Sequence, residues 1–447
     1  MKQFLLNIIL GVALILPFRS HTQDTEAIIR ERVDANETPG IVVAVYENGK
    51  TQFYSFGYAD VASKRPPGPK TLFEIGSITK TFTTTSLALL AEEGKLSLSD
   101  PVQKFLPDSV KAPERDGKSI TLVDLATARS GLPRMPSNMK PADEENPYID
   151  YDVQKMFAFL SGYTLTREIG SQYEYSNFGM GLLGVVIARI EHKSYSEVIA
   201  TKILKPLQMK NTFLNTPERK DKDVATGYSG KKAAKHWTWT DQSSIQGAGG
   251  LLSNADDMVN YLVANLEPQN NPLGRAMTAS HQPRNDAGRE TMKIGLGWHI
   301  RNNIVWHNGG TGGFRTFAGF DPKKHKAVVV LTNSTMGADD LGFHLLDASI
   351  PLKKIRKTVA IDQHVLEVYP GTYQITPAFG IDVTLEKDQL FIHPTGQSKA
   401  EAYPESDTKF FLKVVDAQIE FVRNEKGDVE KLILYQNGQA LSGKKTK

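Results

Sequence analysis

The sequence predicts an α+β fold, in which strands from both ends of a first domain form one antiparallel sheet with helices packed on it. Two strand-like segments, 41–46 and 52–58, flank Asn48-Gly49, a dipeptide typical of a two-residue hairpin turn. The pattern is mainly helical from about 96 to 292 and returns to strands afterwards. The helical part is therefore expected to be a large insertion between early and late strands of one sheet.

The N-terminal segment has the pattern of an export signal. Lys2 is followed by an apolar run at 4–17, after which the chain becomes polar. This run of about 14 residues is shorter than the ~20 that a membrane-spanning helix needs. The pattern predicts a signal peptide at 1–22 and export to the bacterial periplasm or the medium. The alternative is a buried first helix, and no later stretch is long and apolar enough to span a membrane.

Strand patterns return after the helical part. The first domain is expected to span 24–350 and to finish with short strands and a helix near 340–349. A predicted linker at 351–367 contains a basic segment. Short strands at hairpin spacing, without a helical signal, then predict a small antiparallel barrel-like domain at 368–447.

Composition and charge exclude several classes of function. Hydrophobic residues make up 40% and charged residues 23% of the chain, which is typical of globular proteins and excludes a disordered or fibrous one. The chain has 53 Lys and Arg against 50 Asp and Glu, so no basic surface for nucleic acid is expected. It has no Cys, and its ten His are scattered without a metal-binding motif. No metal or cofactor is predicted.

The first motif that indicates chemistry is Ser77-Ile78-Thr79-Lys80. Ser-x-x-Lys occurs five times in the chain, but only this copy follows a glycine and opens a long helical segment. Backbone N–H groups and the positive end of the dipole surround a serine at a helix start, and Lys80 lies one turn away on the same face. If burial lowers the pKa of Lys80, its amine can take the proton of Ser77 and make it a nucleophile. The alternative is a plain N-cap serine.

The second motif, Tyr175-Ser176-Asn177, leads into an apolar helical segment at 178–190. A phenol near cations can have a lowered pKa and relay protons. The Asn177 amide can bind an acyl side chain or hold Lys80. The alternative is an aromatic wedge beside a capping asparagine.

The third motif is His307-Asn308-Gly309-Gly310, at the end of a predicted strand. Glycines at a strand edge let the backbone approach a ligand, where N–H groups can bind a substrate or polarise its carbonyl. No phosphate-binding lysine pattern accompanies them, and the chain has no Gly-x-Ser-x-Gly motif of an α/β-hydrolase. The alternative is a tight loop between strands.

The order of these three motifs resembles that of the penicillin-recognising serine hydrolases. The closest likeness is to class C β-lactamases and their D-peptidase and esterase relatives, and it covers about 24–349. The resemblance implies that Ser77 is the acylated nucleophile, that Lys80 is its base partner and that Tyr175 relays protons. It also implies that the backbone N–H groups of Ser77 and Gly310 form the oxyanion hole. The substrate-binding residues that it implies are Asn177, His307, Asn308 and Gly309.

One departure from this family concerns the third motif. Class C β-lactamases usually carry Lys and Thr before the glycine, where this chain has His307 and Asn308. An unperturbed histidine is mostly neutral at pH 7, so it should bind the carboxylate of a β-lactam less well. The expected activity is hydrolysis of a β-lactam, a D-amino-acid peptide or a small ester through an acyl-enzyme. The alternative is a penicillin-binding sensor that is acylated without turnover, and the oligomeric state stays open.

Overall fold

The computed structural model describes residues 21–446, except 219–221, 290, 378, 398, 414, 416 and 437–438. Residues 1–20, most of the predicted signal peptide, lie outside the described part. The first described helix is α1 (His21–Asp34). Within the described ranges, no helix has both the length and the apolar character needed to cross a membrane.

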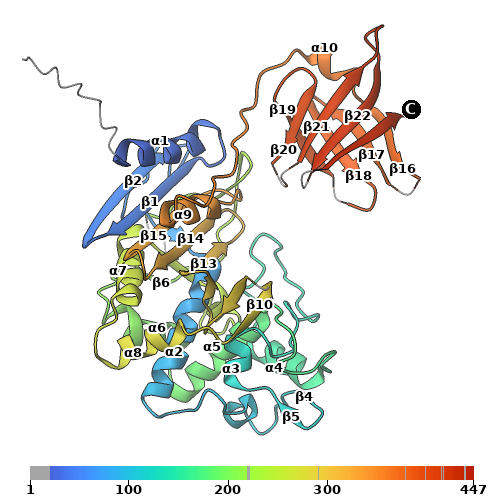
Figure 1. Cartoon of the computed structure of the whole chain (residues 1–447). Coiled ribbons are helices and arrows are strands. Elements are labelled where there is room, and N and C mark those ends of the chain that lie inside the picture. The colour runs from blue at the N-terminus through green and yellow to red at the C-terminus, as the bar shows by residue number, and fades with distance from the viewer. Residues whose placement is uncertain are drawn as a thin grey trace, which may run out of the picture.

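An eight-stranded antiparallel sheet forms the centre of the first domain (Figure 1). Its order is β10-β11-β12-β13-β14-β15-β1-β2, so the early β1–β2 hairpin pairs with the last strand of the late group. This confirms the predicted sheet of early and late strands. The bounds are Gly40–Glu47 (β1), Lys50–Gly57 (β2), Asn285–Arg289 (β10), Met292–Ile294 (β11), His299–Arg301 (β12), Ile304–Gly310 (β13), Arg315–Asp321 (β14) and Lys326–Thr332 (β15).

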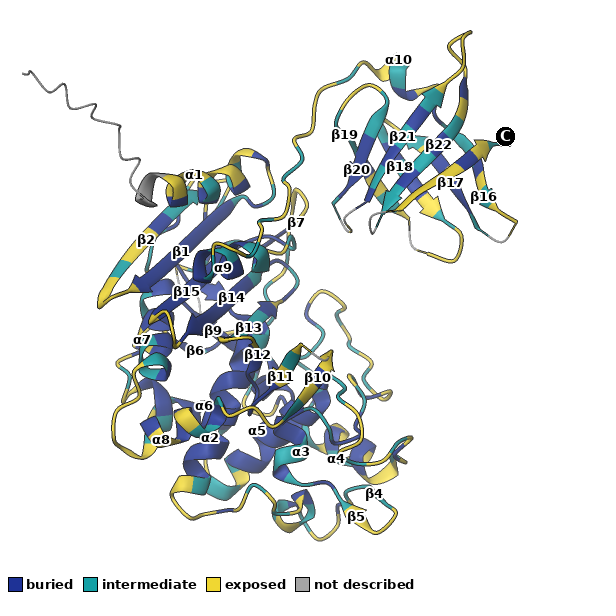
Figure 2. Cartoon of the chain, viewed as in Figure 1, coloured by how far each residue is buried: buried dark blue, intermediate teal, exposed yellow. Residues whose placement is uncertain are grey.

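Both faces of this sheet are covered, and the central strands are buried (Figure 2). Successive side chains of a strand point to opposite faces. On β14, Phe317 packs with Leu341 of α9 (Asp339–Leu346), whereas Ala318 faces the core that contains Met258 of α7 (Ala255–Leu266). Helices α1 and α9 therefore lie on one face, and the helical insertion lies on the other.

The insertion follows β2 and begins with a short strand and a turn of 3-10 helix at Gly76–Ile78 (η1). A second 3-10 turn, η4 (Gln246–Ala248), packs against α2 and α5. The apolar segment predicted at 178–190 lies in α5, which is buried along most of its length. The helices of the insertion are α2 (Thr79–Glu92), α3 (Leu122–Ala126), α4 (Val153–Gly162), α5 (Asn177–Glu191), α6 (Tyr195–Ile199), α7 (Ala255–Leu266) and α8 (Pro272–Ser280).

The C-terminal domain is a closed eight-stranded antiparallel barrel, which confirms the predicted antiparallel barrel-like domain. Its core is mostly aliphatic and contains an aromatic cluster, in which the rings of Tyr369 and Phe421 are stacked 4.1 Å apart. The chain reaches it through an extended segment at 351–362 and a short helix, α10 (Gln363–Leu366). The strands are Gly371–Thr376 (β16), Phe379–Glu386 (β17), Gln389–Pro394 (β18), Ala400–Pro404 (β19), Lys409–Leu412 (β20), Ala417–Arg423 (β21), Val429–Gln436 (β22) and Gln439–Lys445 (β23).

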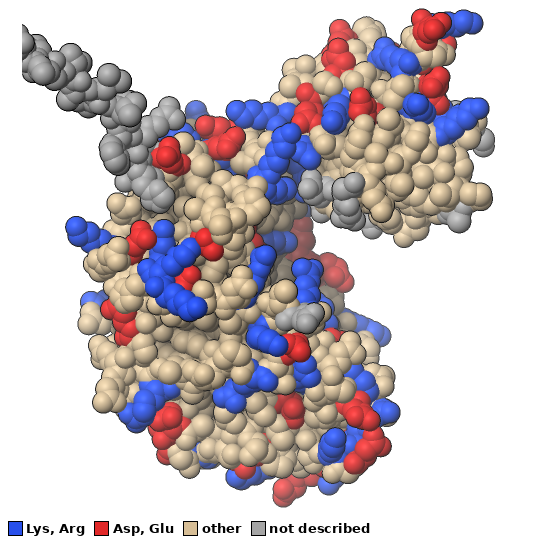
Figure 3. Space-filling model, in the orientation of Figure 1, with Lys and Arg blue, Asp and Glu red and all other residues tan. Residues whose placement is uncertain are grey.

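Charged side chains of both signs are interspersed over the visible face of the molecule (Figure 3). Charged groups are also paired beneath the surface, for example the buried Arg32, which bonds to Glu37 and Asp340. No patch of a single sign dominates this face, which agrees with the near balance of acids and bases in the sequence.

Candidate active site

Ser77 lies in the middle of η1, immediately before α2. The preceding Gly76 has a φ of +50°, which favours glycine. A Cβ at Gly76 would lie 2.7 Å from the backbone nitrogen of Gly310, so a side chain there would push β13 away. The turn therefore holds Ser77 beside the glycine-rich edge that the sequence singled out.

Lys80 is placed to act on Ser77. Its side chain is 2% exposed, and its Nζ lies 2.9 Å from Ser77 Oγ and 2.6 Å from the carbonyl oxygen of Ala248 in η4. Burial, and then the positive charge of Arg134, lower the pKa of Lys80 well below its usual value. The amine can therefore be neutral near neutral pH and accept the hydroxyl proton of Ser77.

Tyr175 lies beside Ser77 and Lys80, so the structure brings together the three residues of the predicted catalytic group. The ring centre is 4.7 Å from Lys80 Nζ, and the phenol is hydrogen-bonded to Ser77. The expectation of a lowered pKa is wrong, because burial raises the pKa of Tyr175 more than its hydrogen bond to Ser77 and the charge of Arg134 lower it. At neutral pH the phenol keeps its proton, so it is suited to donate that proton to a departing group.

His307 faces the same side of the sheet as this group. Its ring centre is 6.2 Å from that of Tyr175, and the side chain is 1% exposed. Burial, and then the neighbouring His299 and Lys80, lower the pKa of His307 well below its ordinary value. The third motif therefore presents a neutral imidazole at the site.

Asn308 does not face the site, which corrects its expected place on the substrate-binding edge. Its Nδ2 donates to Asp339 Oδ2 at 2.5 Å, on the face of the sheet that α9 covers. The reason is strand geometry, because His307 and Asn308 are successive residues of β13 and point to opposite faces. Burial raises the pKa of Asp339 to about 6.

Gly309 and Gly310 bring the backbone of β13 against η1. A Cβ at Gly309 would lie only 1.9 Å from the carbonyl oxygen of Ile75, two residues before Ser77. Such contact needs glycine, so the close approach explains this residue. The structure thus brings the backbone of Gly310 next to the turn that carries Ser77, as an oxyanion hole requires.

Asn177 begins α5, behind the capping residue Ser176. Its Nδ2 lies 3.6 Å from Met135 Sδ, and its Oδ1 is buried without a partner among the described residues. Among the described residues no hydrogen bond joins Asn177 to Lys80, whose amine bonds to Ser77 Oγ and to the carbonyl oxygen of Ala248. The free oxygen leaves Asn177 able to accept a hydrogen bond from a substrate.

Some residues at the site were not predicted from the sequence. The Arg134 guanidinium lies 5.1 Å from the Tyr175 ring centre, and the Arg134 carbonyl accepts hydrogen bonds from the first two N–H groups of α5. Tyr173 Oη lies 3.0 Å from His299 Nε2, and His299 packs on His307. Arg134 lies outside the three motifs, so nothing in the sequence indicated a cation at this place. The described residues contain no group of three or more His, Asp or Glu placed to hold a metal.

Two protein-family models match the chain. Residues 25–346 match the model described as Beta-lactamase, and residues 355–445 match a domain of unknown function, DUF3471. The first match covers the sheet, the helical insertion and all three motifs. The second covers the barrel.

Individual proteins are similar to the chain over most of its length. Penicillin-binding protein 4* of Bacillus subtilis is 28% identical, over 96% of this chain and 99% of its own length. The octameric penicillin-binding protein homologue from Pyrococcus abyssi is 25% identical with a TM-score of 0.66, over 95% of this chain and all of its own. The β-lactamase/D-alanine carboxypeptidase from Pseudomonas syringae, 23% identical with a TM-score of 0.63, covers 74% of this chain and 99% of its own, and it supports the fold alone.

Proposed function

Because the chain belongs to the Beta-lactamase family, whose members are serine acyl-transfer hydrolases, we propose that it hydrolyses a small ester or amide through an acyl-enzyme on Ser77. The observation that carries this proposal is that the buried Lys80 amine lies 2.9 Å from Ser77 Oγ and 4.7 Å from the centre of the Tyr175 ring. The lowered pKa of Lys80 suits it to accept a proton, and the raised pKa of Tyr175 suits it to donate one.

The proposed reaction begins when neutral Lys80 takes the proton of Ser77 as Oγ attacks the substrate carbonyl. The N–H groups of Ser77 and Gly310 stabilise the oxyanion, and one such donor is commonly worth ~10²–10³ in rate. Tyr175 donates its proton to the leaving oxygen or nitrogen and takes one from the ammonium of Lys80. In the second half, a water molecule gives a proton to neutral Lys80 as its oxygen attacks the acyl carbon. The bond from that carbon to Ser77 Oγ then breaks, Oγ regains the proton from Lys80, and the acid is released.

We propose that small esters and D-amino-acid amides are better substrates than β-lactams that carry a carboxylate. His307 stands where a lysine would give a positive charge, and burial favours its neutral form. The second candidate, a sensor that is acylated without turnover, fits the same three groups and differs only in deacylation.

Two measurements test this proposal. The kcat/KM values for nitrocefin, a short-chain nitrophenyl ester, the carboxylate-free D-alanine nitroanilide and a D-Ala-D-Ala peptide, which carries a carboxylate as nitrocefin does, give the substrate class. Intact-protein mass spectrometry after exposure to a fluorophosphonate or a labelled penicillin detects the acyl-enzyme. Product release supports the hydrolase, a stable adduct on Ser77 without product supports the sensor, and the lack of any adduct contradicts both.

The rate is expected to depend on the proton of Lys80. Since burial lowers the pKa of Lys80, kcat/KM for a neutral ester should rise with pH at values below the ordinary lysine range, as the ammonium loses its proton, and then level off. A pH–rate profile measures this. Asp339, whose pKa is raised to about 6, titrates in the same range, so the Asp339→Asn variant is the control. The rise should persist in that variant, and a flat profile in the unaltered protein contradicts the role of Lys80.

Replacing His307 with Lys is expected to change substrate preference. An ammonium at this position should raise kcat/KM for a β-lactam carboxylate relative to a neutral aryl ester by about tenfold, because one charge-assisted hydrogen bond contributes ~1.5 kcal/mol or more. The ratio of the two kcat/KM values is the measurement. His393→Lys, which places the same change on an exposed residue of the barrel, should leave the ratio unaltered. An equal ratio in both variants would show that residue 307 does not set the preference.

We also propose that residues 1–22 direct export to the bacterial periplasm or the medium and are then removed. N-terminal sequencing of the protein from the culture medium and from the periplasm tests this. An intact N-terminus in the cytoplasm contradicts it.

A further inference from the structure

Arg134 is a cation at the candidate site whose charge has no partner. The residue is exposed, and the centre of its guanidinium group lies 5.1 Å from the centre of the Tyr175 ring. Among the described residues, no side chain or carbonyl group forms an ion pair or a hydrogen bond with this guanidinium. Glu174, which precedes Tyr175, is paired with Arg167 instead. The charge of Arg134 is therefore available to a bound molecule.

The backbone fixes Arg134 at the beginning of α5. Its carbonyl oxygen accepts a hydrogen bond from the N–H of Asn177 at 3.0 Å. The carbonyl oxygen of Pro133, one residue earlier, accepts a hydrogen bond from Ser176 Oγ at 2.6 Å. Because the backbone is held in place, only the side chain of Arg134 has to be ordered when an anion binds to it, which lowers the entropic cost of binding.

No acid balances the positive charge inside the site. Burial, and then the charge of Arg134, lower the pKa of Lys80, and burial raises the pKa of Tyr175 against the opposing charge of Arg134. Burial, and then His299 and Lys80, lower the pKa of His307. Among the described residues, no carboxylate contributes to any of these three shifts. A concave site with charge of one sign attracts a ligand of the opposite sign.

The accessible part of the site lies beside Arg134. Ser77 and Tyr175 are half-buried, and the neighbouring Arg134 is exposed. His307 and Lys80, by contrast, are 1% and 2% exposed. An anion in the accessible part can therefore contact the guanidinium of Arg134, whereas the imidazole of His307 is closed to it.

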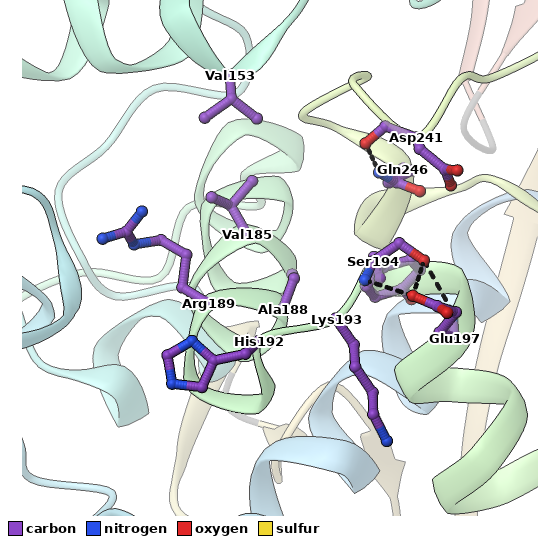
Figure 4. Close-up of a pocket in the computed structure, with 12 residues that line it drawn as sticks. Val153, Val185, Ala188, Arg189, His192, Lys193, Ser194, Glu197, Asp241 and Gln246 are labelled. Carbon is purple, nitrogen blue, oxygen red and sulfur yellow. Dashed lines mark hydrogen bonds between the residues drawn. The ribbon is translucent and has the colours of Figure 1, made fainter.

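Basic side chains also line a groove of about 510 Å³ beside α5 (Figure 4). This groove contains none of the predicted site residues. The titratable side chains of both signs that line it are those of Arg189, His192, Lys193, Glu197 and Asp241. Since acids and bases occur together there, the groove does not favour one sign of ligand, in contrast to the surroundings of Arg134.

The place of Arg134 indicates which part of a substrate it contacts. Its carbonyl holds the N–H of Asn177, and the side chain of Asn177 has a free Oδ1 and can bind an acyl side chain. The carboxylate of a β-lactam lies on the side of the leaving nitrogen, and it was expected to bind near residue 307 on β13. Since Arg134 and Asn177 belong to a different part of the site, we expect them to contact the acyl part of the substrate.

We propose that Arg134 is a specificity-determining residue that binds a carboxylate on the acyl part of the substrate. This inference rests on the proposed hydrolysis at Ser77 and names the substrate class more closely, as esters or amides of dicarboxylic acids that keep one free carboxylate. A guanidinium can donate two parallel N–H bonds to a carboxylate, so the contact gives orientation as well as affinity. The weak binding proposed for a β-lactam carboxylate concerns the leaving group at His307 and is unaffected.

Three chromogenic esters test this in the full-length protein. The nitrophenyl ester of hexanoic acid is neutral, the mono-nitrophenyl ester of adipic acid has a carboxylate on an acyl chain of the same length, and the hexanoate of a carboxynitrophenol has it on the leaving group. The second-order rate constant for nitrophenol release reports acylation of Ser77, whether or not turnover follows. Arg134→Gln should lower the ratio of adipate to hexanoate rate constants about tenfold, the contribution of one charge-assisted hydrogen bond.

Further variants separate charge from structure. Arg134→Glu should lower the adipate ratio below that of Arg134→Gln, because it reverses the charge. Arg30→Gln is the matched control and should keep the ratio of the unaltered protein. Arg30 is also exposed and lies over an aromatic ring, 4.3 Å from the centre of Phe56, but it belongs to α1 on the other face of the sheet. Circular dichroism checks that each variant is folded.

The outcomes that overturn the proposal are distinct. If Arg134 acted only through Lys80 and Tyr175, its replacement would change all three rate constants equally, and an unaltered adipate ratio therefore overturns the proposal. A fall confined to the carboxynitrophenyl ester overturns the assignment to the acyl part. A neutral fluorophosphonate reports on Ser77 separately. Labelling of Ser77 with an unaltered ratio overturns this inference alone, whereas no labelling of the unaltered protein contradicts the hydrolase and this inference with it.

Discussion

The Ser77→Ala variant is expected to lose at least ~10³-fold in kcat/KM for every ester and amide substrate, because no other group can form the acyl-enzyme. The hydroxyl removed lies 2.9 Å from Lys80 Nζ and is also hydrogen-bonded to Tyr175. Lys80 keeps its hydrogen bond to the carbonyl of Ala248, so its amine retains a partner. The free energy of unfolding should therefore change by no more than ~1 kcal/mol.

Steady-state hydrolysis of a nitrophenyl ester and a thermal melt measure the two quantities. Ser137→Ala is the matched control, because Ser137 also begins a Ser-x-x-Lys sequence but is exposed on a loop. This variant should keep full turnover. Retained hydrolysis in Ser77→Ala would reject Ser77 as the nucleophile, whereas loss of activity with an equal loss of stability would indicate a structural role.

The parts of the fold that the sequence predicted depend on local signals. Asn48-Gly49 specifies the β1–β2 hairpin by turn chemistry, and alternating apolar residues mark most barrel strands. Two barrel strands, β19 and β23, were not predicted. β23 (Gln439–Lys445) is mostly polar and exposed, so it has no apolar alternation to detect. It is a strand because its backbone pairs with both β22 and β16, and that pairing closes the barrel.

In the candidate site, too, some contacts follow from local backbone geometry, whereas others exist only because of the tertiary fold. Ser77 and Lys80 are three residues apart at a helix start, so their contact follows from helix geometry. The opposite faces of His307 and Asn308 also follow from local geometry, since both lie on one strand. The carbonyl of Ala248 that holds Lys80 could not be predicted, because any residue type supplies a carbonyl and only the tertiary fold brings it there. Burial, which raises the pKa of Tyr175, is likewise a property of the folded chain.

The second large effect is expected from Gly309→Ala, which adds one carbon where β13 meets η1. That carbon would lie 1.9 Å from the carbonyl oxygen of Ile75 and 2.4 Å from Thr316 Oγ1. Backbone and a hydrogen-bonded side chain fill this space, since Thr316 Oγ1 donates to the same Ile75 oxygen at 3.1 Å. The clash cannot be relieved by a rotamer change, so β13 and the turn before Ser77 must separate. Overpacking of this kind is expected to destabilise the protein by about 1–3 kcal/mol.

The kcat of Gly309→Ala should fall by more than its loss of folding stability alone would cause. The N–H of Gly310 is one residue beyond the clash, and an oxyanion donor must stay within hydrogen-bonding distance of the developing charge. A displacement of ~1 Å at such a site can reduce the rate about 10²-fold, so kcat should fall by about that factor while the thermal melt still reports a folded protein. Gly68→Ala is the control, because a Cβ there meets nothing within 4 Å. If Gly309→Ala and Gly68→Ala both keep full kcat, the close approach of β13 to η1 is not needed for catalysis, and the oxyanion hole must lie elsewhere.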